Sequence, residues 1–129
     1  MLSKVVGKIG ECMAQKYLKS KGFNILNNNY SSRYGEIDII ATKDDCLVFV
    51  EVKFRKKNSI VTGLESVDKR KQSRITKTAL IYLSEFNKDV DTRFDVIEIN
   101  SQNSEKVGAG SIIHIENAFC LEDSYLKAA

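Results

Sequence analysis

The 129-residue chain has no proline and no tryptophan, a single histidine (His114) and only three cysteines, Cys12, Cys46 and Cys120. One histidine excludes a two-histidine metal site, and without a C-x-x-C pair the cysteines cannot form a zinc ribbon or finger. An odd number of widely spaced cysteines is also unsuited to a disulfide framework. We therefore expect three reduced thiols that pack as small hydrophobic side chains in a cytoplasmic protein.

Long apolar segments are also lacking. No stretch approaches the roughly 18 residues that a membrane span requires, and the first residues, MLSKVVGK, contain no apolar signal segment. The sequence therefore predicts an intracellular protein without membrane association. It contains no P-loop, dinucleotide-binding fingerprint or G-x-S-x-G motif. The net charge of +3 is mild, so the distribution of the charges is more informative than their sum.

The length suits one domain, here residues 1–129, which can bury roughly two-thirds of its unfolded surface without disulfides or a structural metal. Hydrophobic periodicity predicts two helices, with Gly22 placed to end the first, and five strands. Polar residues at 27–33 and 100–111 indicate loops. The predicted fold is an α/β mixed sheet flanked by helices, in the order α-β-β-β-α-β-β, over residues 3–20, 23–26, 36–42, 46–53, 64–86, 93–100 and 112–116.

The second and third predicted strands form a hairpin that carries two carboxylates and a lysine. Glu51 and Lys53 lie two residues apart and leave the same face of their strand, and Asp38 lies across from them between two isoleucines. Carboxylate oxygens suit Mg²⁺, and a nearby ammonium can hold a water or neutralise a phosphate. The alternative is a salt bridge on the solvated face of an edge strand.

Basic residues are concentrated after this hairpin. Residues 53–77 hold nine of the 20 lysines and arginines but only two acidic residues. A phosphodiester substrate would need such cations beside the carboxylates, whereas a solvated, charged helix face is the alternative. Apart from Phe54, aromatic residues do not interleave with these cations, which disfavours recognition by base stacking.

Three other polar residues are weaker candidates. Glu11 lies at the margin of the apolar stripe of the first helix, so it joins a metal site only if that helix packs over the hairpin. Arg33 could contact phosphate, but an ordinary surface role fits it better. His114 alternates with two isoleucines, and we expect it to be exposed or satisfied by hydrogen bonds rather than functional.

Taken together, these motifs resemble a known family. Gly7-x-x-Gly10-Glu11-x-x-Ala14, the run GEIDII at 35–40, the run VFVEVK at 48–53 followed by Arg55, the lysine-rich second helix and RFDV at 93–96 resemble the YraN-type family of small bacterial proteins. That family is similar to Holliday junction resolvases and to the PD-(D/E)-x-K nucleases with a restriction-endonuclease-like core. The resemblance covers residues 3–117 and leaves 118–129 as a tail. Ile37 stands where the motif name has its proline.

The resemblance implies a role for each matching position. Asp38 and Glu51, joined by the main-chain carbonyl of Val52, would bind Mg²⁺, for which Mn²⁺ would substitute. Lys53 would orient or activate the attacking water, and Glu11 would complete the site directly or through a water. Either Lys71 or Gln72 would contact the scissile phosphate.

The expected function is metal-dependent endonuclease-like hydrolysis of phosphodiester bonds in DNA, with branched DNA as the substrate by analogy. Two cuts in a four-way junction would imply a homodimer. The alternatives are a non-catalytic nucleic-acid-binding module that keeps the fold, and an interaction protein whose charges are only salt bridges. The expected nucleic-acid-binding residues are Arg55, Lys56, Lys57, Lys69, Arg70, Lys71, Gln72 and Arg74.

Overall fold

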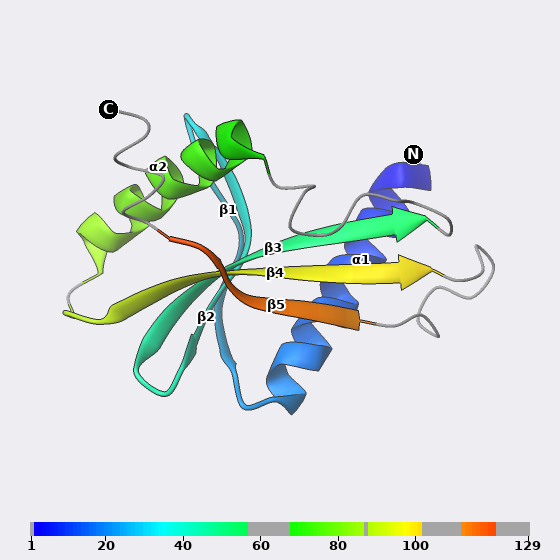
Figure 1. Cartoon of the computed structure of the whole chain (residues 1–129), viewed down its shortest axis with the longest axis horizontal. Helices are drawn as coiled ribbons and strands as arrows, with labels where there is room; N and C mark the ends of the chain where they lie inside the picture. The colour runs from blue at the N-terminus through cyan, green and yellow to red at the C-terminus, as the bar shows by residue number, and fades with distance from the viewer. Residues whose placement is uncertain (1, 57–67, 87, 102–111, 121–129) are drawn as a thin grey trace.

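The computed structural model describes residues 2–56, 68–86, 88–101 and 112–120. It confirms the predicted α/β class and the order α-β-β-β-α-β-β (Figure 1). The elements are α1 (Leu2–Ser20), β1 (Asn24–Ser32), β2 (Gly35–Lys43), β3 (Cys46–Lys56), α2 (Lys69–Glu85), β4 (Asp91–Ser101) and β5 (Ile112–Phe119).

The five strands form one mixed sheet in the order β1-β2-β3-β4-β5. β3 and β4 are parallel, and the other neighbouring pairs are antiparallel. The parallel pair requires a crossover connection, and α2 lies in it. β3 is therefore the central strand, with a neighbour on each side, rather than an edge strand.

The two helices pack against two separate apolar clusters of the sheet. Ala14 and Leu18 of α1 are fully buried against residues such as Val48 and Val50. Ile75 and Ala79 of α2 pack with Phe49 and other residues of the second cluster. Since Val48 and Phe49 are adjacent in β3, they point to opposite faces, and the molecule has three layers with the sheet in the middle.

Several predicted boundaries need correction, β1 most of all. The sequence predicted a strand over 23–26 and a loop over 27–33, but β1 extends to Ser32 and pairs with β2 as far as Ser32–Gly35. The polar residues 27–32 are unusual in a strand, and it is pairing with the apolar β2 that keeps them extended. β3, β4 and β5 also run a few residues beyond their predicted limits, to Lys56, Ser101 and Phe119.

The second helix begins later than predicted. Asp68 is its N-cap, with an extended backbone (φ −71°, ψ 174°), and its carboxylate accepts a hydrogen bond of 2.9 Å from the Lys71 N–H. Asp68 therefore caps the helix, whereas the predicted range 64–86 placed it inside. The predicted helical positions 64–67 and most of the predicted loop over 100–111 lie outside the described residues.

Two local expectations concern Gly22 and the cysteines. Gly22 has φ +91° and follows the end of α1, as predicted. All three cysteines lie in described segments and are free, but Cys12 and Cys120 are exposed and only Cys46 is partly buried, so the expectation of small hydrophobic side chains holds for Cys46 alone. Among the described helices, none combines the length and the apolarity needed to cross a bilayer.

Candidate metal and phosphodiester site

The candidate site lies where β2 and β3 separate. Their pairing runs from Lys43–Cys46 to Ile39–Val50; beyond that point β2 continues against β1, and β3 continues against β4 (Figure 1). Asp38 and Glu51 are the next residues beyond the Ile39–Val50 pair, Asp38 on β2 and Glu51 on β3. The sheet therefore opens next to these two acidic residues.

The two strands remain connected at the opening through a side chain. The main-chain N–H of Val52 donates a hydrogen bond of 2.8 Å to Asp38 Oδ2. Because the N–H and the C=O of a strand residue face the same neighbouring strand, the Val52 carbonyl also faces the opening. The geometry thus brings the three expected metal-binding groups, Asp38, Glu51 and the Val52 carbonyl, to one place.

The alternation of β2 also changes at this point. The sequence predicted that Ile37, Ile39 and Ala41 share a face, but Ile37 packs in the α2-side cluster while Ile39 and Ala41 pack in the α1-side cluster. β2 therefore twists at Asp38, where it loses β3 as a neighbour. The Asp38 carboxylate accordingly lies against the main chain of β3, where it accepts the Val52 N–H.

Asp38 is held in an environment that disfavours its charge. Burial, together with the charge of Glu51 and a hydrogen bond with Glu51, raises the pKa of Asp38 from 3.8 to about 7, although the Val52 N–H and Lys71 act in the opposite direction. The pKa of Asp38 stays raised even though Lys71 is nearby, so an added positive charge would favour the ionised form of Asp38. A divalent cation would supply that charge, and the hard oxygen donors present here are those that Mg²⁺ and Mn²⁺ prefer.

Two lysines compete for Glu51, which is only 7% exposed. Lys71 Nζ lies 2.9 Å from Glu51 Oε1, and Lys53 Nζ lies 3.9 Å from the same oxygen. Burial and the nearby Lys71 ammonium lower the pKa of Lys53. Burial also opposes the charge of Lys71, but its interactions with Lys53 and Glu51 outweigh this effect and raise its pKa. Lys53 is therefore the lysine that releases its proton more readily.

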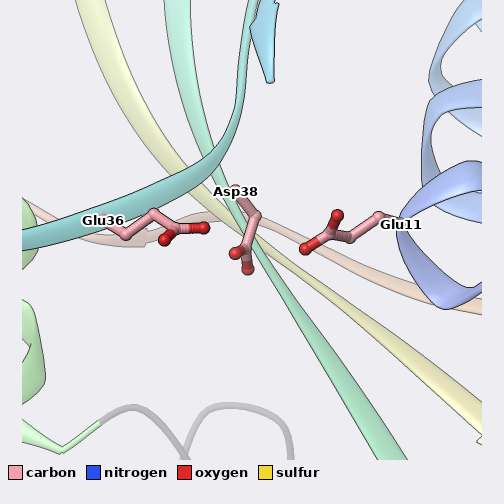
Figure 2. Close-up of side chains that lie close together, drawn as sticks. All are labelled: Glu11, Glu36 and Asp38. Carbon is pink, nitrogen blue, oxygen red and sulfur yellow. The ribbon is translucent and has the colours of Figure 1, made fainter. Parts of the chain in front are cut away.

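Glu11 reaches the site from α1. Carboxylate oxygens of Glu11, Glu36 and Asp38 all lie within 4.8 Å of one another, and Figure 2 shows the Glu11 and Glu36 side chains directed toward Asp38 from either side. Gly10 permits this approach of α1, since a Cβ at position 10 would lie 3.0 Å from Phe54 Cδ2. The condition set for Glu11, that the first helix packs over the hairpin, is met.

Sequence reasoning missed Glu36 and Asn29. The Asn29 amide hydrogen-bonds Glu11 Oε2 at 3.3 Å, and the opposite amide orientation, which we favour because it satisfies both carboxylates, donates to Glu36 Oε1 at 2.8 Å and Glu11 Oε1 at 3.2 Å. The i, i+2 spacing of Glu36 and Asp38 was a usable signal. Asn29 offered none, because it lay in the predicted loop.

The setting of the site does not match the salt-bridge alternative. That alternative placed Asp38, Glu51 and Lys53 on a solvated edge strand, whereas β3 is central and Glu51 is buried beneath α2. A salt bridge is present, but it is formed mainly with a lysine of the helix. A buried Glu51 beside an Asp38 with a raised pKa makes this place a candidate functional site.

The expected nucleic-acid-binding residues are distributed around the start of α2. Lys69, Arg70 and Arg74 are exposed, whereas Lys71 and Gln72 are half-buried, with Lys71 turned into the site. Arg55 and Lys56 belong to the end of β3, and Lys57 lies outside the described residues. The structure adds one aromatic residue that the sequence does not place here: the Tyr34 ring lies near Lys77 of α2.

His114 belongs to a separate polar network on the α1 side of the sheet. Its Nε2 lies 2.7 Å from Asp95 Oδ2, and its Nδ1 lies 3.1 Å from the Tyr17 hydroxyl. Arg93 also contacts both oxygens of Asp95 at 2.8 Å. This confirms the expectation of a histidine satisfied by hydrogen bonds, and the network connects α1 to β4 and β5.

Comparison with known proteins places the chain in a family. The model of "Uncharacterised protein family UPF0102" matches residues 10–99, a span that includes Glu11, Asp38, Glu51 and Lys53. A UPF0102 protein of Sulfurihydrogenibium sp. is 45% identical over 117 residues, which cover 90% of this chain and 95% of the relative. A UPF0102 protein of Caldanaerobacter subterraneus subsp. tengcongensis is 43% identical over 117 residues, which cover 90% of this chain and 95% of the relative. A UPF0102 protein of Alkaliphilus oremlandii is 46% identical over 121 residues, which cover 92% of this chain and 100% of the relative. The chain therefore belongs to the uncharacterised protein family UPF0102, the YraN family that its sequence motifs resemble.

Proposed function

We propose that this protein is a metal-dependent endonuclease that hydrolyses phosphodiester bonds in DNA. The observation that carries the proposal is the pair Asp38 and Glu51 at the opening between β2 and β3, where Asp38 has a pKa of about 7 and two lysines face Glu51. Buried carboxylates that repel one another have little structural value, because such a pair costs stability in the absence of a cation. A metal-binding role accounts for that cost.

Asp38, Glu51 and the Val52 carbonyl would hold Mg²⁺ or Mn²⁺, with Glu11 and Glu36 near enough to bind through water. When bound, the ion would lower the pKa of a water and offset the charge that develops on the phosphate. Asp38 must lose its proton before it can act as a ligand. Its elevated pKa therefore makes occupancy of the site depend on pH near neutrality.

The lysines have different parts in this proposal. Lys53, whose pKa is lowered, is suited to hold the attacking water and to accept or return a proton. Lys71 keeps its charge and lies against Glu51. Because a cation on Glu51 would repel Lys71, its ammonium would turn toward the phosphate of the substrate, with the half-buried Gln72 beside it.

The exposed Lys69, Arg70 and Arg74 would hold the DNA backbone, together with Arg55, Lys56 and Lys57. Branched DNA is the proposed substrate, and it rests on the resemblance to Holliday junction resolvases alone. Resolution of a four-way junction needs two cuts, so we propose a homodimer with one site per chain. Light scattering on the protein with and without a junction measures that stoichiometry.

A second candidate function is a nucleic-acid-binding module that does not cut. One observation favours it: Lys71 Nζ lies 2.9 Å from Glu51, in the region where a divalent cation would bind. In this alternative the lysine itself compensates the carboxylates, and the basic residues bind DNA without chemistry. The two functions share a DNA interface and differ in the effect of metal.

A cleavage assay separates them. End-labelled four-way junction and plain duplex are incubated with Mg²⁺, Mn²⁺, Ca²⁺ or a chelator. The nuclease proposal expects cutting in Mg²⁺ or Mn²⁺ that is lost in Asp38→Asn and Lys53→Met, while binding of the junction is retained. Asp45→Asn is the matched control, because it removes an exposed carboxylate in the β2–β3 turn where asparagine tolerates the positive φ of 64°. Binding without cleavage in all of these metals would support the module instead.

A further inference from the structure

The turn between β1 and β2 holds two cations around an aromatic ring. The guanidinium carbon of Arg33 lies 4.9 Å from the centre of the Tyr34 ring, and Lys77 Nζ lies 5.4 Å from it. Arg33 Nη2 also donates a hydrogen bond of 2.8 Å to the Tyr34 hydroxyl. These side chains are exposed, so the contacts hold two positive charges in position at the surface.

The turn is attached firmly to α2. The hydroxyl groups of Ser32 and Thr78 are 2.7 Å apart, and the Tyr34 N–H donates to Ser32 Oγ at 3.1 Å. A Cβ added at Gly35 would lie 3.4 Å from Arg74 Cβ, so the turn and the helix are in close contact there. Arg33, Tyr34, Arg74 and Lys77 therefore form one surface, which we name the turn platform.

The turn platform continues from the candidate site along α2. Lys71, which contacts Glu51, precedes Lys77 by six residues, or about 9 Å along the helix axis. Phosphates of one strand of duplex DNA advance about 3.4 Å per nucleotide along the axis. Because the strand also winds around that axis, successive phosphates are farther apart in space than this rise. A strand whose scissile phosphate lies at the site would therefore bring a phosphate within a few nucleotides of it to the turn platform.

We propose that the turn platform is a phosphate-binding site for the DNA backbone within a few nucleotides of the scissile bond. Arg33, Arg74 and Lys77 supply the positive charges, and Tyr34 is a positioning residue that holds Arg33 and Lys77 ready to bind. This inference rests on the proposed function, since it takes DNA as the substrate. It adds Arg33, Tyr34 and Lys77 to the expected DNA-binding residues, and it joins them to Arg74 in one surface.

Binding of a labelled duplex and of a labelled four-way junction, measured by fluorescence anisotropy in EDTA over a series of salt concentrations, tests the proposal. Log affinity falls as log salt concentration rises, and each phosphate contact that is lost reduces the magnitude of this slope by about 0.9. We expect that decrease in Lys77→Met and in Arg33→Ala. The matched control is Lys16→Met, which removes an exposed charge of α1 and leaves the slope unchanged.

Tyr34 separates positioning from simple charge. Tyr34→Ala removes no charge but is expected to weaken binding several-fold, while Tyr34→Phe, which keeps the ring, stays closer to wild type. A scan of methylphosphonate substitutions along the labelled strand locates the contact. A neutral methylphosphonate at the contacted position should lower the affinity of wild type. The same substitution should leave the affinity of the double variant Arg33→Ala/Lys77→Met unchanged.

The outcomes distinguish the two proposals. Slopes in Lys77→Met and Arg33→Ala that equal those of wild type and Lys16→Met would overturn the turn platform, even if wild type cuts DNA in Mg²⁺. Reduced slopes in Lys77→Met and Arg33→Ala, together with a wild type that binds DNA but never cuts it, would support the platform and overturn the nuclease. Absence of DNA binding by wild type at low salt would overturn both.

Discussion

The main-chain N–H of Val52 donates a hydrogen bond of 2.8 Å to the Asp38 carboxylate across the opening between β2 and β3. The Asp38 side chain thus accepts the hydrogen bond that a main-chain carbonyl of β2 would accept if the β2–β3 pairing continued. The bond keeps the two strands together while a second oxygen of Asp38 stays available to the site. It also ties the geometry of the acid to that of the Val52 carbonyl.

The first prediction concerns Asp38→Asn in the absence of metal. The folded pKa of Asp38 is raised to about 7 from 3.8, so its ionisation destabilises the fold as pH rises between those values, and the penalty is complete above about pH 7. Asp38→Asn should stabilise the metal-free protein by about 1–2 kcal/mol at pH 8, a figure that allows for solvent screening. The gain should shrink toward pH 4.

Thermal unfolding at several pH values measures this difference. Asp45→Asn, at an exposed turn position, serves as the control. Added Mn²⁺ should raise the melting temperature of wild type and not of Asp38→Asn. A variant that is less stable than wild type at pH 8 without metal would contradict the interpretation of Asp38 as an acid whose ionisation destabilises the fold.

The second prediction compares the two lysines that face Glu51. Lys71 Nζ lies 2.9 Å from Glu51 Oε1 and Lys53 Nζ lies 3.9 Å from it, so Lys71 is the stronger competitor for a cation. Lys71→Met should bind Mn²⁺ about three- to tenfold more tightly than wild type, and Lys53→Met should gain less. Titration calorimetry without DNA provides the affinities. Equal gains, or weaker binding in Lys71→Met, would rule out the competition.

The third prediction concerns the Asp95 network. Burial acts to raise the pKa of Asp95, but hydrogen bonds from His114, Arg93 and the Asn117 N–H outweigh burial and lower the pKa. The stabilisation by ionised Asp95 is complete above the pKa that Asp95 has in the unfolded chain. It is lost as the pH falls through the lower pKa that Asp95 has in the folded protein. Asp95→Asn should therefore lower the free energy of unfolding by about 2–4 kcal/mol at pH 7. The difference from wild type should be smaller at acidic pH.

Urea unfolding of wild type and Asp95→Asn at pH 7 and pH 4 measures that change. Asp44→Asn, in an exposed turn with a positive φ of 49°, removes a carboxylate without partners of this kind and should be near neutral at both pH values. A loss in Asp95→Asn that is independent of pH would show that hydrogen-bond geometry, and not charge, stabilises the network.

The fourth prediction uses two glycines of α1. A Cβ at Gly10 would lie 3.0 Å from Phe54 Cδ2, whereas a Cβ at Gly7 would meet nothing within 4 Å. Gly7→Ala should stabilise the protein by about 0.5–1 kcal/mol through helix propensity. Gly10→Ala gains the same propensity but must displace the Phe54 ring, so it should be about 1–2 kcal/mol less stable than Gly7→Ala. Equal stabilities of Gly7→Ala and Gly10→Ala would show that the Phe54 ring moves aside without an energetic cost.

Some of these features were accessible from the amino-acid order alone. Alternation of apolar and polar residues set the class and the order of the elements, and it placed Glu51 and Lys53 on one face of a strand next to Asp38. The late start of α2 was not accessible, because Leu64 and Val67 continue the apolar period through Asp68, and only the backbone shows Asp68 as a cap. The strand at 27–32 was hidden because its polar residues are extended by their pairing partner.

Local periodicity, set by side chains a few residues apart, determined where helices and strands form and which acidic residues share a hairpin. Tertiary structure decided what those residues meet. It separated β2 from β3, brought Lys71 to Glu51, joined Glu36 and Asn29 to Glu11, and placed Lys77 beside Tyr34. Contacts of this kind link segments far apart in the chain, such as Tyr17 and His114 at a separation of 97 residues. They depend on how the layers pack, and no pattern of neighbouring residues encodes them.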